Sequence, residues 1–352
     1  MKIQSIPTDS EHELVVECID QSAGYHAIIA IHSTVLGPAV GGTRLWSYAS
    51  LADATSDALR LSRGMTLKCA AAGLDLGGGK SVILLPEKAI NREALFRAHG
   101  RAIESLGGRY VTAEDVGTTP TDMEYVRRET RFVAGLPSQS GDPSPVTARG
   151  VFRAITAAAL HRWGSESLES RTVILQGCGN VGRNLARQLA AAGASVVVTD
   201  IDPTRAARTA AELGGAMVAP DAVYDVTADI FAPCALGGIL NQATVPRLSV
   251  SIVAGAANNQ LAGEQDALEL ARRGILYVPD FIANVGGVIN GCREIAGWAP
   301  LRAAERVEAI YDTTLAVLRD AERDGITPAE AATRLVSARL DRARSAPGVK
   351  PR

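Results

Sequence analysis

Two different rhythms of apolar and polar positions divide the chain. Over the first 135 residues, apolar runs that favour β-strands stand well apart, at residues 14–19, 25–32, 81–85 and 109–112. Apolar positions at helical spacing predict helices over residues 51–63 and 92–106, and a run of glycines predicts a turn over residues 37–43. The first part of the chain is therefore expected to be a mixed α/β unit.

From residue 171 onward, short β runs alternate with amphipathic helices. The expected strands cover residues 172–176, 195–199, 230–231, 252–254 and 276–278. The expected helices cover residues 180–192, 203–213 and 264–273, with a helix over 148–163 before them and a helical tail over 300–344. Such alternation requires right-handed crossovers and gives a parallel sheet covered by helices on both faces.

A segment rich in proline and serine, residues 136–145, separates the two rhythms. A chain of 352 residues is also too long for one core, since domains hold roughly 100–200 residues. We therefore predict two α/β domains, 1–135 and 148–322, joined by a hinge over 136–147. A C-terminal helix and tail, 323–352, follow them.

Composition and charge exclude several classes of protein. Lys and Arg number 36 against 38 Asp and Glu, so no basic surface is expected to hold nucleic acid. Apolar stretches fall far short of the ~20 residues that cross a bilayer, and residues 1–13 lack the apolar core of a secretory signal. Five scattered cysteines without a CxxC pair, and five histidines without HExxH or HxH spacing, favour a reducing cytoplasm and no metal.

The segment Gly177-Cys178-Gly179-Asn180-Val181-Gly182 fits the GxGxxG pattern of dinucleotide-binding folds. It follows an expected strand and opens an expected helix, and Asp200 closes the next strand. Gly177 would make the turn, Gly179 would admit a pyrophosphate at the helix N-terminus, and Gly182 would let helix pack on strand. The Asp200 carboxylate suits a ribose diol and would repel a 2′-phosphate, which favours NAD over NADP. The alternative is a glycine turn without a ligand.

A second candidate site lies in the first domain. Lys68 and Lys80 stand in apolar surroundings, and Asp115 follows an expected strand. The Gly79-Lys80-Ser81 ending resembles a P-loop, but Leu74 replaces the required first glycine and a β run follows where a helix is needed. Glycines 77–79 suggest backbone drawn close to a small ligand, the alternative being a glycine bulge beside a surface lysine. One lysine could hold a substrate carboxylate and the other, with a lowered pKa, could act as a base, with Asp115 moving the proton.

Several ordered motifs resemble the Glu/Leu/Phe/Val dehydrogenase superfamily, most closely its leucine, valine and phenylalanine branch. They are residues 36–44 (LGPAVGGTR), Lys68 with 77–80, 112–117 (TAEDVG), 145–147, the 177–182 turn, 232–237, 255–260 and 284–287. The resemblance implies an N-terminal substrate, catalytic and oligomerisation domain. It also implies a Rossmann-type NAD-binding domain and C-terminal helices that return to the first domain.

The resemblance also implies roles for single residues. Lys80 and Asp115 match the acid–base pair, and Lys68, helped by backbone at Gly41 and Gly42, matches the group that binds the substrate carboxylate. Around the cofactor it implies Thr147, the turn 177–182, Asp200, Ile201, Cys234, Ala235, Asn258 and Asn284. Asn258 also lies near the substrate amino group. Arg149, where tyrosine is common, and Val285, where alanine is common, depart from the family pattern.

The side-chain pocket is expected to involve Val40, Met65, Ala113, Val288 and Gly291. Val40 stands where glutamate enzymes of the family have lysine, so glutamate should be rejected. Ala113 and Val288 resemble the branched-chain enzymes, whereas Gly291 opens one wall. We therefore predict an apolar L-amino acid, branched aliphatic first and aromatic second.

The predicted reaction is reversible NAD-dependent oxidative deamination to the 2-oxo acid and ammonia, by a homo-oligomer with neither nucleic-acid nor membrane partners. Two alternatives stay open. A noncatalytic NAD-binding regulator on this fold would be expected to lack one of Lys68, Lys80 and Asp115, and all three are present. A hydroxy-acid dehydrogenase would need a histidine–carboxylate pair and an arginine clamp, and the histidines stand outside the motifs.

Overall fold

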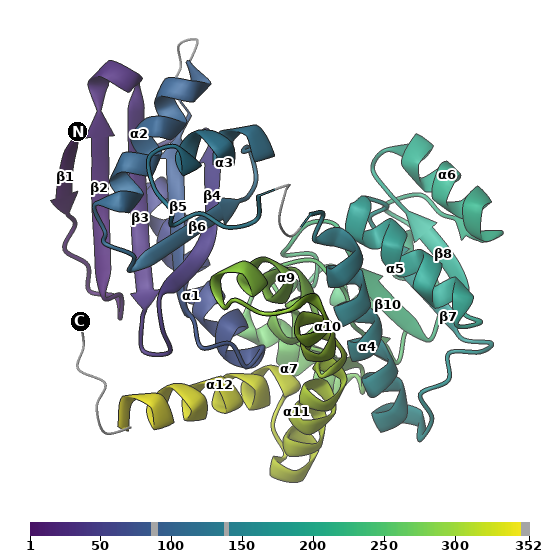
Figure 1. The fold of residues 1–352 in the computed structure, drawn as a ribbon. Coiled ribbons are helices and arrows are strands. Elements are labelled where there is room, and N and C mark those ends of the chain that lie inside the picture. Colours follow the sequence, from purple (N-terminus) through teal and green to yellow (C-terminus); the bar gives the residue numbers. More distant parts are fainter. Residues whose placement is uncertain (86–90, 137–140, 346–352) are drawn as a thin grey trace. The chain divides into compact units, whose positions relative to one another are not determined.

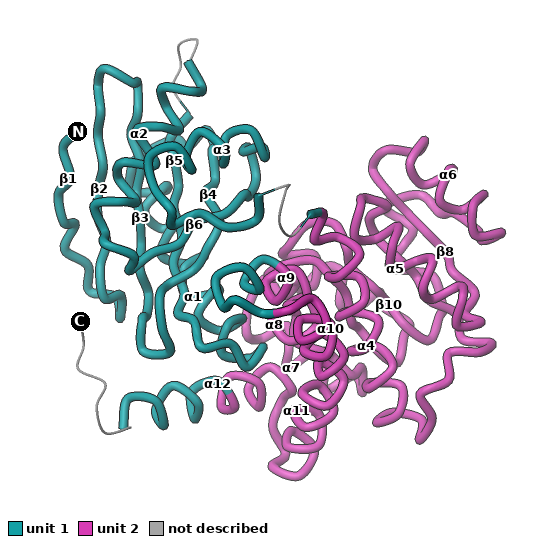
Figure 2. The backbone as a smooth tube through the Cα atoms, in the orientation of Figure 1, with its two compact units in different colours: residues 1–141, 291–298, 336–352 teal, residues 142–290, 299–335 magenta. Residues whose placement is uncertain are grey.

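The computed structural model describes residues 1–85, 91–136 and 141–345. The chain forms two compact units (Figure 2). The first is built from Met1–Gly141, Gly291–Trp298 and Val336–Arg352, and the second from Asp142–Asn290 and Ala299–Leu335. These divisions differ from the expected ones, because 291–298 joins the first unit and 323–335 stays with the second. Part of the expected hinge, 137–140, and the end of the expected tail, 346–352, lie outside the described residues.

The first unit contains a mixed six-stranded sheet (Figure 1). Its strands, in spatial order, are β1 (Lys2–Ser5), β2 (Leu14–Asp20), β3 (Tyr25–Ser33), β5 (Gly77–Leu84), β4 (Ala39–Trp46) and β6 (Tyr110–Glu114). Neighbours from β1 to β5 run antiparallel, whereas β4 pairs parallel with both β5 and β6. The carboxyl ends of β4, β5 and β6 therefore meet at one edge of the sheet.

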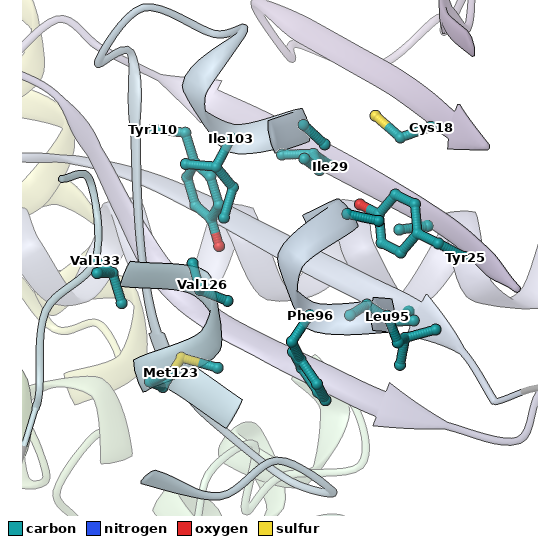
Figure 3. Close-up of a cluster of buried hydrophobic side chains, with 14 of the residues drawn as sticks. Cys18, Tyr25, Ile29, Leu95, Phe96, Ile103, Tyr110, Met123, Val126 and Val133 are labelled. Atoms are coloured by element: carbon teal, nitrogen blue, oxygen red, sulfur yellow. The ribbon is translucent and has the colours of Figure 1, made fainter. Parts of the chain in front are cut away.

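Helices cover both faces of this sheet because β3 is apolar on both sides. Ile28 and Ala30 pack with residues of α1 (Leu51–Ala71). Ile29, one position further along, belongs to a different cluster, which includes Leu95 and Phe96 of α2 (Arg92–Glu104) and Met123 of α3 (Pro120–Arg127) (Figure 3). The period-2 alternation of a strand thus assigns successive side chains to two separate cores.

Two elements of the first unit differ from the sequence-based expectation. The turn expected over residues 37–43 is wrong, because it is mostly the strand β4; the turn itself ends at Gly37, whose N–H donates to the Thr34 carbonyl. A Cβ at Gly41 would overlap the Gly79 carbonyl, so glycine serves here to bring strands together. Helix α1 continues past the expected end at residue 63 to Ala71 and carries Lys68 on its last turn.

The second unit has a parallel sheet (Figure 1), as the alternating pattern predicts. Its order is β12 (Leu276–Tyr277), β11 (Ile252–Val253), β10 (Ile230–Pro233), β7 (Thr172–Gln176), β8 (Ser195–Thr199) and β9 (Ala216–Met217). Its helices are α4 (Ser144–Trp163), α5 (Asn180–Ala191), α6 (Pro203–Leu213), α7 (Glu264–Arg272), α8 (Asp280–Ala283), α10 (Pro300–Glu308) and α11 (Ile310–Asp324). The predicted two-domain α/β fold with a Rossmann-type sheet is confirmed.

Toward the end of the sequence, two helices each contain residues of both units. Helix α9 (Gly286–Ile295) and helix α12 (Pro328–Ser345) each begin in the second unit and end in the first. Within the first unit, the Arg339 guanidinium donates to the carbonyls of Ala70 and Leu74, each at 2.8 Å, and to the Asp75 carboxylate at 2.9 Å. The expected return of the C-terminal chain to the first domain is therefore confirmed, because Arg339 binds the loop after α1. Within the described ranges, no helix has both the length and the apolar character that a membrane span requires.

Candidate active site

Lys80 and Asp115 meet on one face of the first sheet. Lys80 lies in the middle of β5 with its side chain only 7% exposed, and Asp115 directly follows β6. Nζ of Lys80 lies 2.5 Å from Oδ2 of Asp115. Strand β4 separates the two parent strands, so the long lysine side chain reaches across it. The structure thus brings together the two residues that the sequence singles out for acid–base chemistry.

The pair shifts the protonation equilibria of both groups. Burial disfavours the ammonium form and lowers the pKa of Lys80, although the Asp115 carboxylate opposes this. Burial also works against the ionised carboxylate of Asp115, but the charge and hydrogen bond of Lys80, and then the charge of Arg44, together lower the pKa of Asp115. A lysine that releases its proton more readily than usual, beside a carboxylate that stays ionised, is suited to general base catalysis.

Arg44 and Asp57 belong to the same cluster, and the sequence reasoning missed both. Arg44 on β4 places Nε 3.3 Å from Asp115 Oδ2 and its NH1 nitrogen 2.8 Å from Asp57 Oδ2 on α1. Asp57 also accepts from the Tyr48 hydroxyl at 2.7 Å. Arg44 stands two positions after Gly42 and so on the same face of the strand, and this spacing could have identified it from the sequence. Asp57 could not be identified in this way, because its contribution depends on how α1 packs.

The opposite face of the same strands holds a buried polar network. Thr43, Ser81 and Thr112 alternate with Arg44, Lys80 and Ala113, and the Thr43 hydroxyl lies 2.8 Å from Ser81 Oγ and 2.6 Å from Thr112 Oγ1. His99 Nε2 of α2 lies 2.8 Å from the same Thr43 oxygen. Burial lowers the pKa of His99 to about 3, so the imidazole is neutral. This network fixes the strands that carry the candidate site.

The three glycines before Lys80 serve protein packing. A Cβ at Gly77 would overlap the Ser33 carbonyl, and one at Gly78 would overlap the Thr66 amide of α1. A Cβ at Gly79 would lie 2.7 Å from the Tyr110 ring. The interpretation that these glycines draw backbone toward a ligand is therefore wrong; each one admits a neighbouring element of the first unit.

The other substrate-site candidates of this unit lie on the same three elements. Val40, Gly41 and Gly42 are on β4, Ala113 is on β6, and Met65 and Lys68 are on α1. The Gly41 carbonyl accepts a hydrogen bond from the buried Tyr110 hydroxyl at 2.8 Å, which orients this stretch of backbone. A Cβ at Gly42 would lie 2.7 Å from Cβ of Asp115, so the glycine lets the carboxylate approach β4.

In the second unit the glycine-rich turn lies between β7 and α5. Gly177 has a φ of 102°, which favours glycine. A Cβ at Gly182 would overlap the Gly177 carbonyl, whereas one at Gly179 would have no heavy atom within 4 Å. Gly179 is the N-cap of α5 and supplies no side-chain cap, so this helix N-terminus could accept an anion such as a pyrophosphate. The turn fits a dinucleotide.

Asp200 is positioned directly after β8. Its carboxylate accepts the N–H of Cys178 at 2.7 Å and that of Asp202 at 2.8 Å, which fixes its orientation beside the turn. Ile201 is 89% exposed and so offers a free apolar surface next to it. Cys234 and Ala235 follow β10 and pack against Gly177. Asn180 and Val181 begin helix α5.

The remaining candidates of this unit gather where α8 and α9 meet α4. Nδ2 of the buried Asn284 lies 3.0 Å from Asn258 Oδ1. Its Oδ1 is buried without a hydrogen-bond partner, so it could accept from an amide of a ligand. A Cβ at Gly287 would lie 2.6 Å from Thr147 Oγ1, so the double glycine lets α9 approach Thr147. Val288 follows on α9, and Gly291, on the same helix, is already part of the first unit.

The two departures from the family pattern have clear places in the second unit. Arg149 on α4 makes a two-pronged ion pair with Glu308 of α10, at 2.6 and 2.9 Å. Val285 is buried, with only 1% of its surface exposed. Among the residues with described positions, no group of three histidine, cysteine, aspartate or glutamate side chains could hold a metal ion.

Comparison with known proteins gives matches along most of the chain. Residues 12–132 match the family described as Glu/Leu/Phe/Val dehydrogenase, dimerisation domain, and residues 205–348 match Glutamate/Leucine/Phenylalanine/Valine dehydrogenase. Residues 171–232, which include the glycine-rich turn, match NADP oxidoreductase coenzyme F420-dependent.

Individual relatives match this chain over almost the full length of both proteins. A leucine dehydrogenase of Thermoactinomyces intermedius is 50% identical over 344 residues, covering 97% of this chain and 94% of the relative. A valine dehydrogenase of Streptomyces coelicolor is 49% identical over 342 residues, covering 96% and 94%. The crystal structure of L-tryptophan dehydrogenase from Nostoc punctiforme superposes with a TM-score of 0.85 at 44% identity, covering 96% of this chain and 98% of that one.

Proposed function

The chain belongs to the Glu/Leu/Phe/Val dehydrogenase family and is an oxidoreductase; from this premise we propose that it catalyses the reversible, NAD-dependent oxidative deamination of an apolar L-amino acid. The products are the 2-oxo acid, ammonia and NADH. The observation that carries the proposal is the pair of buried Lys80 and partly buried Asp115, 2.5 Å apart. Burying an ion pair costs free energy, and an acid–base role explains why the site keeps it.

The first unit supplies the groups that move protons. A bound nicotinamide would supply one chemical capacity, the acceptance of a hydride from the substrate Cα. Lys80, with its lowered pKa, takes a proton from water so that the oxygen can attack the oxidised carbon. Asp115 is ionised at rest, because its pKa is lowered, and it relays protons by taking one up transiently and giving it to the departing amino group. Lys68 and the backbone of Gly41 and Gly42 bind the substrate carboxylate and so set its orientation.

The second unit supplies the nicotinamide cofactor site. Gly179 and the N-terminus of α5 would hold the pyrophosphate, and Asp200 would accept hydrogen bonds from the adenosine ribose. Two backbone N–H groups already orient the Asp200 carboxylate, and its negative charge disfavours a 2′-phosphate, so we propose NAD as the cofactor. Thr147 and the unpartnered Oδ1 of Asn284 would lie around the nicotinamide.

Two features support an apolar substrate. Val40 is apolar and nearly buried, so a substrate carboxylate beside it would lose hydration without gaining a partner. The named relatives act on leucine, valine and tryptophan, which supports a branched aliphatic substrate first and an aromatic one second. We also propose a homo-oligomer, because residues 12–132 match a dimerisation domain.

The alternative functions are less well supported. A noncatalytic NAD-binding regulator would have no use for a desolvated lysine in an ion pair. A hydroxy-acid dehydrogenase would need a histidine that titrates near neutrality at the site. His99 lies on the other face of the sheet, and burial lowers its pKa to about 3, so it cannot fill that role.

The test is NADH formation at alkaline pH across a panel of L-amino acids, run in parallel with NADP. We expect turnover with leucine, valine, phenylalanine and tryptophan, and none with glutamate or D-leucine. Turnover of L-glutamate would contradict the role of Val40, and equal use of NADP would contradict the role of Asp200. No turnover of any amino acid would contradict the proposal as a whole.

A further inference from the structure

Two cations share one carboxylate oxygen in the candidate active site. Lys80 Nζ and Arg44 Nε lie 2.5 and 3.3 Å from the same Oδ2 atom of Asp115. The other end of the Arg44 guanidinium binds Asp57 Oδ2 at 2.8 Å. Asp57 is itself held by Tyr48. A line of alternating charges therefore runs from Lys80 through Asp115 and Arg44 to Asp57.

We propose that Arg44 is a positioning residue that holds Asp115 against Lys80 and, with Asp57, sets the pH range over which this pair exchanges protons. The inference rests on the proposed function, in which Lys80 and Asp115 form the acid–base pair. Neither Arg44 nor Asp57 needs to touch the substrate for this role. Both act through the pair.

The geometry explains why an arginine is suited to this place. A guanidinium stays charged throughout the working pH range and can bridge two carboxylates in fixed directions. The Arg44 side chain is 21% exposed and that of Asp57 15%, so water screens their charges less than at the surface. Because Lys80 and Arg44 hold the same Asp115 oxygen from two sides, the Asp115 carboxylate cannot rotate freely and stays within reach of Lys80.

The charges of Arg44 and Asp57 act on Lys80 in opposite directions. Positive Arg44 disfavours a second ammonium nearby and lowers the pKa of Lys80, whereas negative Asp57 raises it, both effects being smaller than burial and Asp115. Removing Arg44 should therefore raise the pKa of Lys80, and removing Asp57 should lower it. A purely structural role would not give shifts of opposite sign.

Other charged and titratable groups lie on the surrounding elements and are not substituted in this comparison. They are Tyr48 before α1, Arg60 and Lys68 on α1, and Tyr110 and Glu114 on β6. Arg60 pairs with the second oxygen of Asp57 at 2.6 Å. Burial raises the pKa of Tyr110 to about 12, so its hydroxyl stays neutral. Burial, followed by the nearby Asp122 and Asp115, raises the pKa of Glu114.

The experiment compares pH profiles of kcat/KM for L-leucine oxidation with NAD, from neutral to alkaline pH. The variants are Arg44→Met, Arg44→Lys, Asp57→Asn and Lys80→Ala, with Arg101→Met as a matched control. Arg101 pairs with Asp20 at 3.2 Å and is 43% exposed in the same unit, so its loss should leave the profile unchanged. The substrate amino group titrates identically in every variant, so differences between profiles report the enzyme.

We expect the rising limb of Arg44→Met to move to higher pH by roughly one unit, and that of Asp57→Asn to move to lower pH. Arg44→Lys keeps a positive charge, so its rising limb should lie close to the wild-type limb. Its kcat should still be reduced, because one side-chain nitrogen cannot bridge both carboxylates. Thermal unfolding and NADH binding show which variants are folded. If Arg44→Met does not fold, Asp57→Asn still tests the sign, because a rising limb at higher pH in that variant would overturn the proposal.

The outcomes separate the two proposals. Turnover of Lys80→Ala close to wild type would overturn the proposed function. If Lys80→Ala is inactive while the limbs of Arg44→Met and Asp57→Asn coincide with the wild-type limb, the pH role of Arg44 is overturned and the proposed function stands. Shifts in the same direction for both variants would also overturn it.

Discussion

Lys80 is both a buried side chain and the proposed proton-transfer group. Lys80→Ala removes the proposed proton-transfer group but no contact of the glycine-rich turn, so kcat should fall roughly 10²–10⁴-fold while NADH binding is kept. Lys68→Ala should mainly raise KM, because a carboxylate-binding group already acts in the ground state. Steady-state kinetics with NADH fluorescence titration checks both. A Lys68→Ala enzyme with normal KM and lost kcat would reverse the two assignments.

Gly291 tests the shape of the substrate pocket. A Cβ at this position would meet no heavy atom within 4 Å, so the fold can accept a side chain. If Gly291 lines the pocket, Gly291→Val should lower the ratio of kcat/KM for phenylalanine to that for leucine by about tenfold. Gly291→Ala should give an intermediate ratio. Identical ratios in all three enzymes would place Gly291 outside the pocket.

Residue types in the sequence identified the Lys80–Asp115 pair, but not what surrounds it. Asp57 was not predictable, because its contact with Arg44 depends on the packing of α1 over β4. His99 was set aside because it lies outside every motif, yet it anchors the hydroxyl groups beneath the site. Sequence motifs identify the side chains that are proposed to face a ligand. The residues that support those side chains can be identified only once the strands and helices are placed.

Among the elements, α1 depends on glycine for its position over the sheet. Gly78→Ala should destabilise the protein by roughly 1–3 kcal/mol, because the methyl group would overlap Thr66 and force α1 off β5. Gly64→Ala, in the middle of the same helix, has free space around the new methyl group and should be neutral or stabilise by up to about 1 kcal/mol. Urea unfolding of both variants checks the contrast, and equal effects would contradict the packing role of Gly78.

The elements themselves were predicted well where their apolar pattern was regular. The strands β7 and β8 and the helix α6 have the predicted bounds. The pattern failed at β4, where glycines resemble a turn in sequence but serve the close approach of neighbouring strands. It also ended α1 too early, at residue 63, whereas the helix continues through Gly64 to Ala71, because packing on the sheet outweighs the low helix propensity of one glycine.

At the scale of the whole molecule, buried neutral His99 couples stability to pH. The folded state lowers the pKa of His99 from 6.5 to about 3, so below pH 6.5 the unfolded chain binds a proton that the folded protein does not. The contribution of His99 to stability is therefore complete above pH 6.5 and falls toward pH 3, by up to about 1.4 kcal/mol per pH unit. His99→Asn should reduce this dependence, and the remainder in this range includes His32, whose pKa burial lowers to about 4. The urea midpoint measured across this range checks it, and an unchanged slope would show that His99 is not the cause.

The return of Arg339 to the loop after α1 has a consequence for the order of events during synthesis. The carbonyl groups of Ala70 and Leu74 emerge from the ribosome some 270 residues before the guanidinium that binds them, and the second unit is translated in between. Until then the Leu74 carbonyl lacks its guanidinium partner, the Ala70 carbonyl keeps the Gly73 N–H of its own turn, and the end of α1 that carries Lys68 lacks its clamp. The unit that is synthesised first is thus completed last, so premature termination would yield a finished cofactor fold beside an unfinished catalytic one.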